Sequence, residues 1–283
     1  MSEKVNCKSV LIGNFGKPVW ENPTEFMMEA AFRHHGMKFR YITTEVAEED
    51  LEAAYHGVKA MGYKGFNCTL PHKQAIIPLL DGLGESAGIM EAVNCVVERE
   101  GWYIGENTDG KGYLESLQEI TDPAGKKIVI FGAGGAARAI TVELAIAGAA
   151  EIIIVNRSKE RGRELSGLLC EKTAVKASYH KLEGDYSVPE GTDIVINATN
   201  IGLFPDSSRV PVDLSSLNSD MIISDVIPNP PRTRFIQEAE SIGCTVIDGI
   251  GMLVNQGRIA LKYWSGVDVD SAVMRKTLED IFA

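Results

Sequence analysis

The sequence predicts an α/β protein of two domains with mostly parallel sheets. Short runs of β-branched residues alternate with longer helical patterns from one end of the chain to the other, which is typical of this fold class. The chain has 283 residues, more than one compact core usually holds. Apolar residues make up 45% of it and charged residues 24%, as in ordinary globular proteins. Disordered chains and small disulfide-stabilised scaffolds are therefore excluded.

The first half of the chain contains three expected strands and two expected helices. The strands are predicted at residues 9–13, 39–43 and 65–69, and the helices at residues 24–35 and 48–61. Pro23 precedes the first helix and Gly36 closes it, as is usual at helix starts and ends. A linker is expected at residues 101–110, leading into a helix that joins the two domains.

A second series of elements follows a turn-rich segment at residues 121–125. Strands are predicted at residues 128–131, 152–155, 193–197 and 222–225, and helices at residues 136–147, 159–172 and 233–242. A final amphipathic helix is predicted at residues 273–282. Strands that alternate with helices in this way predict βαβ units and a parallel sheet.

The charge balance and the cysteines restrict the partners. The chain has 28 Lys and Arg against 39 Asp and Glu, a formal net charge of −11, which predicts no nucleic-acid partner and no membrane partner. Its five cysteines are widely spaced, with no Cys-x-x-Cys pair, which indicates reduced thiols in a cytoplasmic protein and no metal site. Residues 128–155 are apolar but carry charges and glycines, so they predict strand, helix and strand rather than a membrane span.

A glycine-rich turn at the start of the second series indicates a dinucleotide site. Gly132, Gly134 and Ala137 match the G-x-G-x-x-G/A spacing between a strand and a helix, the context that the dinucleotide-binding motif requires. Glycines let backbone N–H groups approach a pyrophosphate, and the helix start at Gly135 and Ala136 offers a partial positive charge. The alternative is an ordinary tight turn between a strand and a helix.

The end of the next strand favours NADP over NAD. NAD-selective sites usually place an acid there, about twenty residues after the glycines, whereas this chain carries Asn156, Arg157 and Ser158. Arg157, with Arg161 one helical turn further on, can hold a ribose 2′-phosphate through bidentate hydrogen bonds. The alternative is that both arginines are solvated at a helix start, where cations oppose the helix dipole.

Two polar segments of the first half contain candidate catalytic residues. Residues 65–73 (G-F-N-C-T-L-P-H-K) end a predicted strand in a proline turn, and residues 107–110 (N-T-D-G) open a helix. By residue type alone, Lys73 is a solvated helix residue and Asp109 a helix N-cap. Neither segment by itself indicates catalysis.

Taken together, several stretches resemble the shikimate dehydrogenase family. The matching pieces are residues 65–73, 92–94 (A-V-N), 107–110, 132–137, 156–158 (N-R-S), 197–199 (N-A-T), 251–253 (G-M-L) and 256–257 (Q-G). They follow one another in the family's order along nearly the whole chain. The resemblance implies a substrate domain at residues 1–108, completed by C-terminal helices at 250–283, and an NADP-binding Rossmann domain at 109–249.

The same resemblance implies an activity and its residues. The family transfers hydride reversibly between NADP(H) and a ring hydroxyl or ketone, typically of shikimate and 3-dehydroshikimate. Lys73 and Asp109 would be the catalytic pair, because hydride leaves a carbinol carbon only as the hydroxyl proton is also removed. Further roles fall on substrate-binding Thr69, Asn94 and Gln256 and on cofactor-binding Thr199. The expected partner is a small molecule, and a homodimer is allowed.

Two departures from the family pattern leave the substrate open. Where the family holds the substrate carboxylate with Ser-x-Ser-Pro, this chain reads N-P-T-E, so Asn22 and Thr24 become the hydrogen-bond donors. Glu21 and Glu25 bring negative charge to the place where an anionic substrate would lie. Pro228 stands where the family commonly has Tyr.

The substrate alternatives are therefore shikimate with 3-dehydroshikimate, or quinate or an uncharged cyclitol or polyol. A nucleotide-binding regulator without catalysis is the alternative from another class. Lys73 and Asp109 argue against a regulator, since a protein that only binds needs neither of them.

Overall fold

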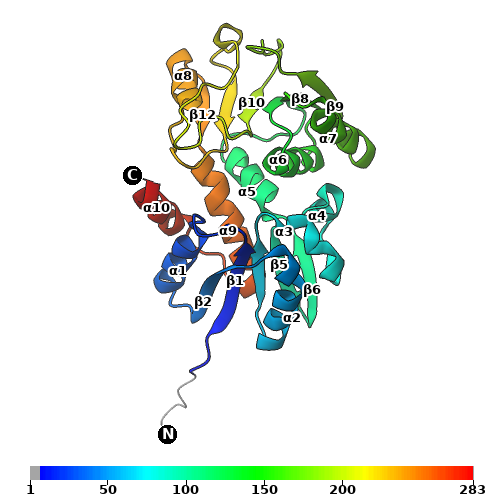
Figure 1. Ribbon diagram of the computed structural model, residues 1–283. Coiled ribbons are helices and arrows are strands. Elements are labelled where there is room, and N and C mark those ends of the chain that lie inside the picture. Colours follow the sequence, from blue (N-terminus) through cyan, green and yellow to red (C-terminus); the bar gives the residue numbers. More distant parts are fainter. Residues whose placement is uncertain (1–6, 283) are drawn as a thin grey trace. The chain divides into compact units, whose positions relative to one another are not determined.

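The computed structural model describes residues 7–282 and divides into two compact units. The N-terminal unit comprises the chain up to Asn107 together with Ala260–Ile281, and the central unit comprises Thr108–Ile259 with Phe282. Figure 1 shows one sheet and its helices in each unit. Helix α9 (Gly249–Ser265) begins in the central unit and ends in the N-terminal one.

The N-terminal unit is a six-stranded mixed sheet in the order β2-β1-β3-β5-β6-β4. Its strands are β1 (Val10–Gly16), β2 (Phe39–Glu45), β3 (Gly65–Cys68), β4 (Gly82–Leu83), β5 (Cys95–Arg99) and β6 (Trp102–Glu106). Its helices are α1 (Thr24–His34), α2 (Leu51–Met61), α3 (His72–Ala75), α4 (Glu85–Met90) and α10 (Ser271–Phe282), with short 3-10 turns at Glu48–Asp50 and Ile77–Leu79. The C-terminal α10 lies beside α1 (Figure 1), near a hydrogen bond from the Asp270 N–H to His35 Nε2 at 2.9 Å.

The core of this unit packs α2 on one face of the sheet. Phe15 and Phe66 on neighbouring strands stack with ring centroids 4.8 Å apart, and Tyr55 and Val58 of α2 belong to the same buried cluster. Trp264 near the end of α9 donates from its indole N–H to the Val96 carbonyl oxygen at 2.9 Å. This bond fastens the C-terminal part of the chain to the N-terminal sheet.

The prediction for residues 101–110 is wrong in part, because Trp102–Glu106 is the strand β6 rather than a linker. It pairs antiparallel with β5. Glu100 and Gly101 between the two strands have φ of 53° and 89°, the geometry of a two-residue hairpin turn that follows the twist of its strands. The sequence prediction also ended β1 at residue 13, whereas pairing with β2 extends it to Gly16.

The central unit is a parallel six-stranded sheet in the order β12-β11-β10-β7-β8-β9. Its strands are β7 (Lys127–Phe131), β8 (Glu151–Asn156), β9 (Lys176–Lys181), β10 (Ile194–Asn197), β11 (Ile222–Asp225) and β12 (Thr245–Ile247). Its helices, besides α9, are α5 (Thr108–Gln118), α6 (Gly135–Ile146), α7 (Lys159–Lys172) and α8 (Arg234–Ile242), and a 3-10 turn lies at Leu214–Ser216. This is the strand order of a Rossmann sheet. The edge strands β9 and β12 were not predicted, because β9 is largely polar and β12 has only three residues.

Helix α5 approaches its neighbours through glycines. A Cβ at Gly110 would lie 2.2 Å from the Ala139 carbonyl oxygen of α6, and one at Gly112 would lie 2.5 Å from the Gln256 backbone nitrogen of α9. Backbone atoms cannot be displaced easily, so these positions admit no side chain. The packing holds the first turn of α5, which carries Asp109.

Substituting Gly110 with Ala is expected to destabilise the protein by about 1–3 kcal/mol through overpacking against α6. Thermal unfolding measures the effect as a lower Tm. The matched control is Gly167→Ala on α7, where a Cβ meets open space, so that the better helix propensity of Ala leaves the Tm equal or raises it. Equal Tm values for the two variants would contradict the close approach of α5 and α6.

Candidate functional site

A cavity of about 230 Å³ lies at the carboxyl ends of β7, β8 and β10 in the central unit. Its lining includes six predicted cofactor residues, namely Gly132, Gly134, Asn156, Arg157, Arg161 and Thr199. The structure adds Ala133, Val155, Leu182, Ala198, Asn200 and Ile201. Three other predicted residues do not line it: Gly135 and Ala136 open α6, and Ser158 caps α7. Ligands of Rossmann folds bind at this edge of the sheet.

The glycine turn fits a pyrophosphate. Gly132 has φ of 113° and a Cβ there would lie 2.6 Å from the Ala198 carbonyl oxygen, whereas Gly134 and Gly135 face open space. Helix α6 begins at Gly135 without a side-chain cap on its first N–H groups. Those N–H groups and the helix dipole favour an anion at this end.

Arg157 and Arg161 are exposed residues that line the cavity. Within residues 7–282, neither guanidinium forms an ion pair with a carboxylate. The turn that carries them is fixed by Asn156 Nδ2, which donates to the Ser158 carbonyl oxygen at 3.0 Å, and by Ser158 Oγ, which accepts from the Arg161 N–H at 3.3 Å. Two unpaired guanidinium groups beside a glycine cradle suit a ribose 2′-phosphate.

A buried polar network bonds two residues of the cavity lining, Thr199 and Ile201. Asn197 Nδ2 donates to Asp225 Oδ1 at 3.0 Å and to the Ile201 carbonyl oxygen at 3.2 Å, while Asn197 Oδ1 accepts from the Thr199 hydroxyl at 2.7 Å. The Thr233 hydroxyl donates to Asp225 Oδ2 at 2.7 Å. Burial raises the pKa of Asp225, and these donated hydrogen bonds oppose the rise. The network therefore orients the loop from Thr199 to Ile201.

In the N-terminal unit, the structure brings Thr69, Lys73 and Asn94 to one end of the sheet. The Val93 N–H donates to the Lys73 carbonyl oxygen at 2.8 Å, and the Asn94 carbonyl oxygen accepts from the Cys68 N–H at 2.9 Å. Burial raises the pKa of the Cys68 thiol to about 12, and the positive charge of Lys73 opposes the rise. Lys73 is half-buried and Asn94 is buried.

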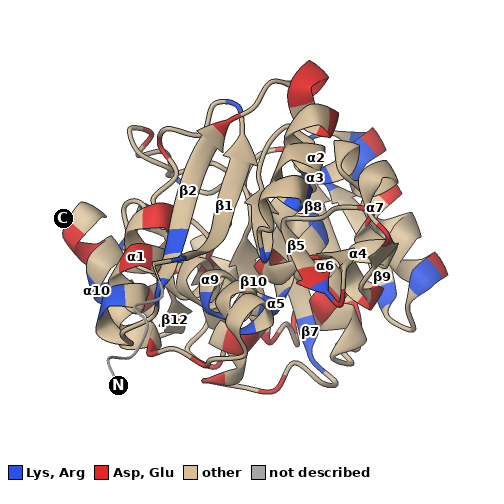
Figure 2. Ribbon diagram, turned by 90° about the horizontal axis from the view of Figure 1, so that it is seen from below, with Lys and Arg blue, Asp and Glu red and all other residues tan. Residues whose placement is uncertain are grey.

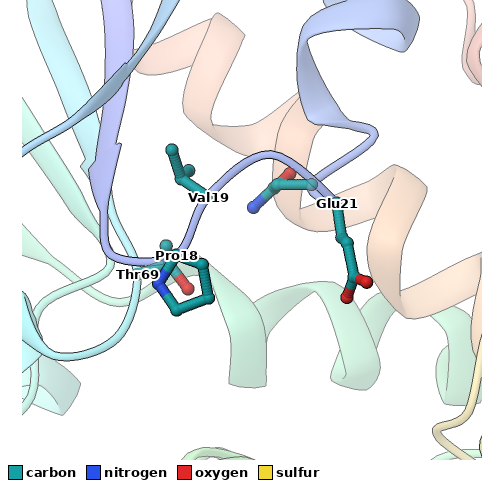
Figure 3. A pocket seen from close by; sticks show the side chains of 5 residues that line it. Pro18, Val19, Glu21 and Thr69 are labelled. Atoms are coloured by element: carbon teal, nitrogen blue, oxygen red, sulfur yellow. The ribbon is translucent and has the colours of Figure 1, made fainter.

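A second cavity, also of about 230 Å³, lies beside Thr69 and is lined by Pro18, Val19, Glu21, Asn22 and Thr69. In Figure 3, Thr69 lies next to Pro18 at one end of the loop after β1, and the Glu21 carboxylate lies at the other end. We call it the loop pocket. Two predicted substrate residues, Asn22 and Thr69, therefore line one pocket.

Thr24 does not line the loop pocket. It is the first residue of α1, it is 5% exposed, and its N–H donates to Asn22 Oδ1 at 3.0 Å. At the start of α1 the Thr24 side chain points into the protein interior, which the sequence alone does not reveal. Its backbone thereby orients the Asn22 carboxamide.

Glu25, which was expected with Glu21 to bring negative charge to the substrate, does not line the loop pocket either. Glu25 Oε2 accepts from the Thr43 N–H at 3.0 Å, and Glu29 Oε1 accepts from the Tyr41 N–H at 3.0 Å. Strand β2 is the edge of the sheet, so these N–H groups have no neighbouring strand to bond. Figure 2 shows α1 alongside β2. Glu25 is therefore engaged with the strand edge, and Glu21 is the acid that lines the loop pocket.

The remaining predicted site residues, Asp109 and Gln256, lie in the central unit. Asp109 is in the first turn of α5 and half-buried. Gln256 is buried in α9, where its Nε2 donates to the Leu253 carbonyl oxygen at 3.0 Å. The close approach of Gly112 to the Gln256 backbone places α5 against α9 at this level.

Sequence reasoning missed several lining residues of these cavities, including Asn200 and Ile201 after the predicted motif at residues 197–199. Leu182 follows β9, an edge strand that was not predicted. Pro18 and Val19 belong to a loop whose course depends on pairing with the loop after β3: the Lys17 N–H donates to the Leu70 carbonyl oxygen at 2.9 Å. Such pairing between distant segments leaves no local signal in the sequence.

Among residues 7–282, no helix is long and apolar enough to cross a membrane. The same residues contain no group of three or more His, Cys, Asp or Glu side chains placed to hold a metal ion. The cysteines form no disulfide in the described part of the chain.

The fold and the cavities define an α/β protein with a dinucleotide-binding Rossmann unit. Comparisons with family models match the shikimate dehydrogenase substrate binding domain at residues 15–96, shikimate / quinate 5-dehydrogenase at residues 115–204 and the shikimate 5′-dehydrogenase C-terminal domain at residues 249–279. A relative from Methanopyrus kandleri, called shikimate dehydrogenase (NADP(+)), is 40% identical over 98% of both chains. This chain belongs to the shikimate dehydrogenase family.

Two solved structures resemble the whole chain. One is the ligand-free 5-ketofructose reductase of Gluconobacter sp. strain CHM43, which is 51% identical with a TM-score of 0.96 and covers 98% of this chain and 100% of its own. The other is a shikimate dehydrogenase in complex with NADP+, which is 38% identical with a TM-score of 0.91 over 99% of this chain and 98% of its own.

Replacing Asn197 with Ala is expected to lower the free energy of unfolding by about 1–3 kcal/mol, because it leaves buried donors and acceptors unsatisfied. Urea unfolding followed by fluorescence measures the loss. As a control, Asn218→Ala removes an exposed side chain whose Oδ1 accepts from the Asp220 N–H, and it is expected to change stability by less than about 0.5 kcal/mol. Comparable losses in both variants would argue against the network.

Proposed function

We propose that this protein is an NADP-dependent oxidoreductase of the shikimate dehydrogenase type, which interconverts a ring secondary alcohol and a ketone. The first substrate pair to test is shikimate and 3-dehydroshikimate, because relatives that match nearly the whole chain are called shikimate dehydrogenase (NADP(+)). The observation that carries the proposal is the Rossmann cavity with two unpaired arginines in a chain that matches this family from end to end.

The N-terminal unit is assigned to the substrate and the central unit to the cofactor. Gly132 and Gly134 would hold the pyrophosphate through backbone N–H groups, and Arg157 and Arg161 the 2′-phosphate. Gly135, Ala136, Asn156, Ser158 and Thr199 complete the cofactor-binding set. When bound, the nicotinamide cofactor supplies or accepts the hydride.

Lys73 is the proposed acid and base at the substrate oxygen. Its ammonium would give a proton to the carbonyl oxygen as the ketone is reduced, and its amine would take the hydroxyl proton in the reverse direction. Asp109 is the second catalytic residue that the family resemblance implies. Asn22, Thr69, Asn94 and Gln256 are assigned to hydrogen bonds with the substrate hydroxyls, whereas Thr24 acts through the orientation of Asn22.

A second candidate substrate is a polyhydroxylated ketone such as 5-ketofructose. It is supported by the 51% identity to the Gluconobacter reductase over 98% of the chain. The absence of a Ser-x-Ser-Pro segment also favours an uncharged substrate, because none of the residues that line the loop pocket supplies positive charge to a carboxylate. The hydride transfer would be the same for both substrates. The loop pocket would hold a hydroxyl group of the polyol in place of a carboxylate.

Localisation in the cytoplasm and a homodimer belong to the same proposal. The widely spaced thiols, which form no disulfide in the part of the chain that the structure describes, support a reducing compartment. Size-exclusion chromatography with light scattering decides between monomer and dimer.

Lys73→Ala is expected to lower kcat by about 10²–10⁴-fold, because the substrate oxygen loses its proton donor. The KM should change much less, since the hydrogen bonds of Asn94 and Thr69 remain. Initial rates of NADPH oxidation with the preferred ketone measure both constants, and Lys64→Ala serves as the control, since Lys64 forms a surface ion pair with Glu98. Near-normal turnover in Lys73→Ala excludes Lys73 as the acid.

Arg157→Ala is expected to weaken NADP(H) by about tenfold to a hundredfold and to leave NAD(H) almost unchanged, since charge-assisted hydrogen bonds contribute about 1.5–3 kcal/mol. Fluorescence titration of the reduced cofactors measures both affinities. The control is Arg163→Ala on α7, the helix that follows Arg157; this residue lies outside the cavity lining. Equal losses for the two cofactors in Arg157→Ala would remove the 2′-phosphate assignment.

A further inference from the structure

The loop pocket has an unusual charge for a site that would hold a carboxylate. Its five lining residues, all within the described part of the chain, include one charged side chain, the exposed Glu21. Lys17, the cation next to the pocket in sequence, is exposed and does not line it. An anionic group entering this pocket would therefore meet a carboxylate without a lining cation to offset it.

The other lining groups are suited to hydroxyls. Asn22 Oδ1 accepts from the Thr24 N–H at 3.0 Å, which fixes the carboxamide and leaves its Nδ2 group for donation. The Thr69 hydroxyl can donate or accept, and the Glu21 carboxylate accepts only. A polyol, whose hydroxyls both donate and accept, can satisfy all three groups at once.

The neighbouring loop backbone holds these side chains in place. The Thr69 N–H donates to the Phe15 carbonyl oxygen at 2.9 Å, and the Asn22 N–H donates to the Val19 carbonyl oxygen at 3.1 Å. Because Glu25 is bonded to the Thr43 N–H, it cannot exchange roles with Glu21 without breaking the edge contact of β2. The negative charge of the pocket therefore depends on Glu21.

From these contacts we infer that Glu21 is a specificity-determining residue that makes the enzyme prefer uncharged polyhydroxylated ketones to carboxylate-bearing ones. The carboxylate accepts hydrogen bonds from substrate hydroxyls and repels a substrate carboxylate. The inference rests on the proposed function, whose reaction it keeps. The ketone carbon gains a hydride and its oxygen gains a proton, while NADPH is oxidised to NADP+, so the products are a neutral polyol and NADP+.

The test compares one uncharged and one anionic ketone, 5-ketofructose and 3-dehydroshikimate, with NADPH and purified full-length protein. The wild type is expected to show a kcat/KM for 5-ketofructose at least about tenfold above that for 3-dehydroshikimate. Glu21→Gln keeps the shape and hydrogen-bonding capacity of the side chain but removes its charge. It is expected to narrow this ratio at least about tenfold, mainly by raising kcat/KM for the anion.

Two further measurements separate charge from structure. Glu52→Gln removes the same charge from α2 of the same unit, outside the loop pocket, and should leave the ratio within about twofold of the wild type. Raising the ionic strength should narrow the wild-type ratio, because salt screens the repulsion, but should have little effect on the ratio in Glu21→Gln.

Opposite outcomes are distinguishable. A wild type that prefers 3-dehydroshikimate, or an unchanged ratio in Glu21→Gln, overturns the role of Glu21 while Lys73-dependent reduction of either ketone still supports the proposed function. A wild type that binds NADPH but reduces neither ketone overturns the proposed function, and the inference fails with it.

Discussion

Backbone hydrogen bonds from the end of β1 and the loop after it to the loop after β3 hold together the residues that line the loop pocket. The Lys17 N–H bonds the Leu70 carbonyl oxygen, and the Thr69 N–H bonds the Phe15 carbonyl oxygen, both at 2.9 Å. They continue the pairing of two adjacent parallel strands past the end of the sheet. Because buried backbone groups need partners, this pairing determines where Asn22, Thr69 and the following Lys73 lie.

The Rossmann cavity depends on a comparable arrangement in the central unit. Three strands end at one edge of the parallel sheet, and a different segment of the cavity lining follows each of them: the glycine turn after β7, the turn with Arg157 after β8 and the loop with Thr199 after β10. The Asn197 and Asp225 network lies beneath that loop and is buried. Backbone geometry and buried hydrogen bonds thus shape the cavity, and two exposed arginines add positive charge to its lining.

Two acidic residues near the loop pocket have different structural roles because of their positions. Glu25 and Glu21 are four residues apart and have the same chemistry. Glu25 accepts from the Thr43 N–H of the edge strand β2, and Glu21 lines a pocket. The same net charge of −11 therefore includes carboxylates that bond the edge of the sheet and one that lines the loop pocket.

Much of the fold and of the lining of the Rossmann cavity follows from the sequence alone, because strong local patterns encode them. The apolar strands β7, β8, β10 and β11 and the helices between them were predicted within a few residues, and so was the glycine turn. Runs of buried β-branched residues and glycines at required backbone conformations leave such patterns in a single segment. The motif around Lys73 and the arginine at position 157 were likewise recognisable from residue type and spacing.

Only the tertiary structure decided the features that depend on contacts between distant segments. The β5–β6 hairpin, the polar edge strand β9, the inward turn of Thr24 and the bond from the Thr43 N–H to Glu25 have no distinctive local pattern. Each is determined by which strand lies at an edge, which face of a helix is covered and which backbone groups lack a partner. The sequence by itself therefore determined the family and the glycine turn of the Rossmann unit, whereas folding decided which of two glutamates lines the loop pocket.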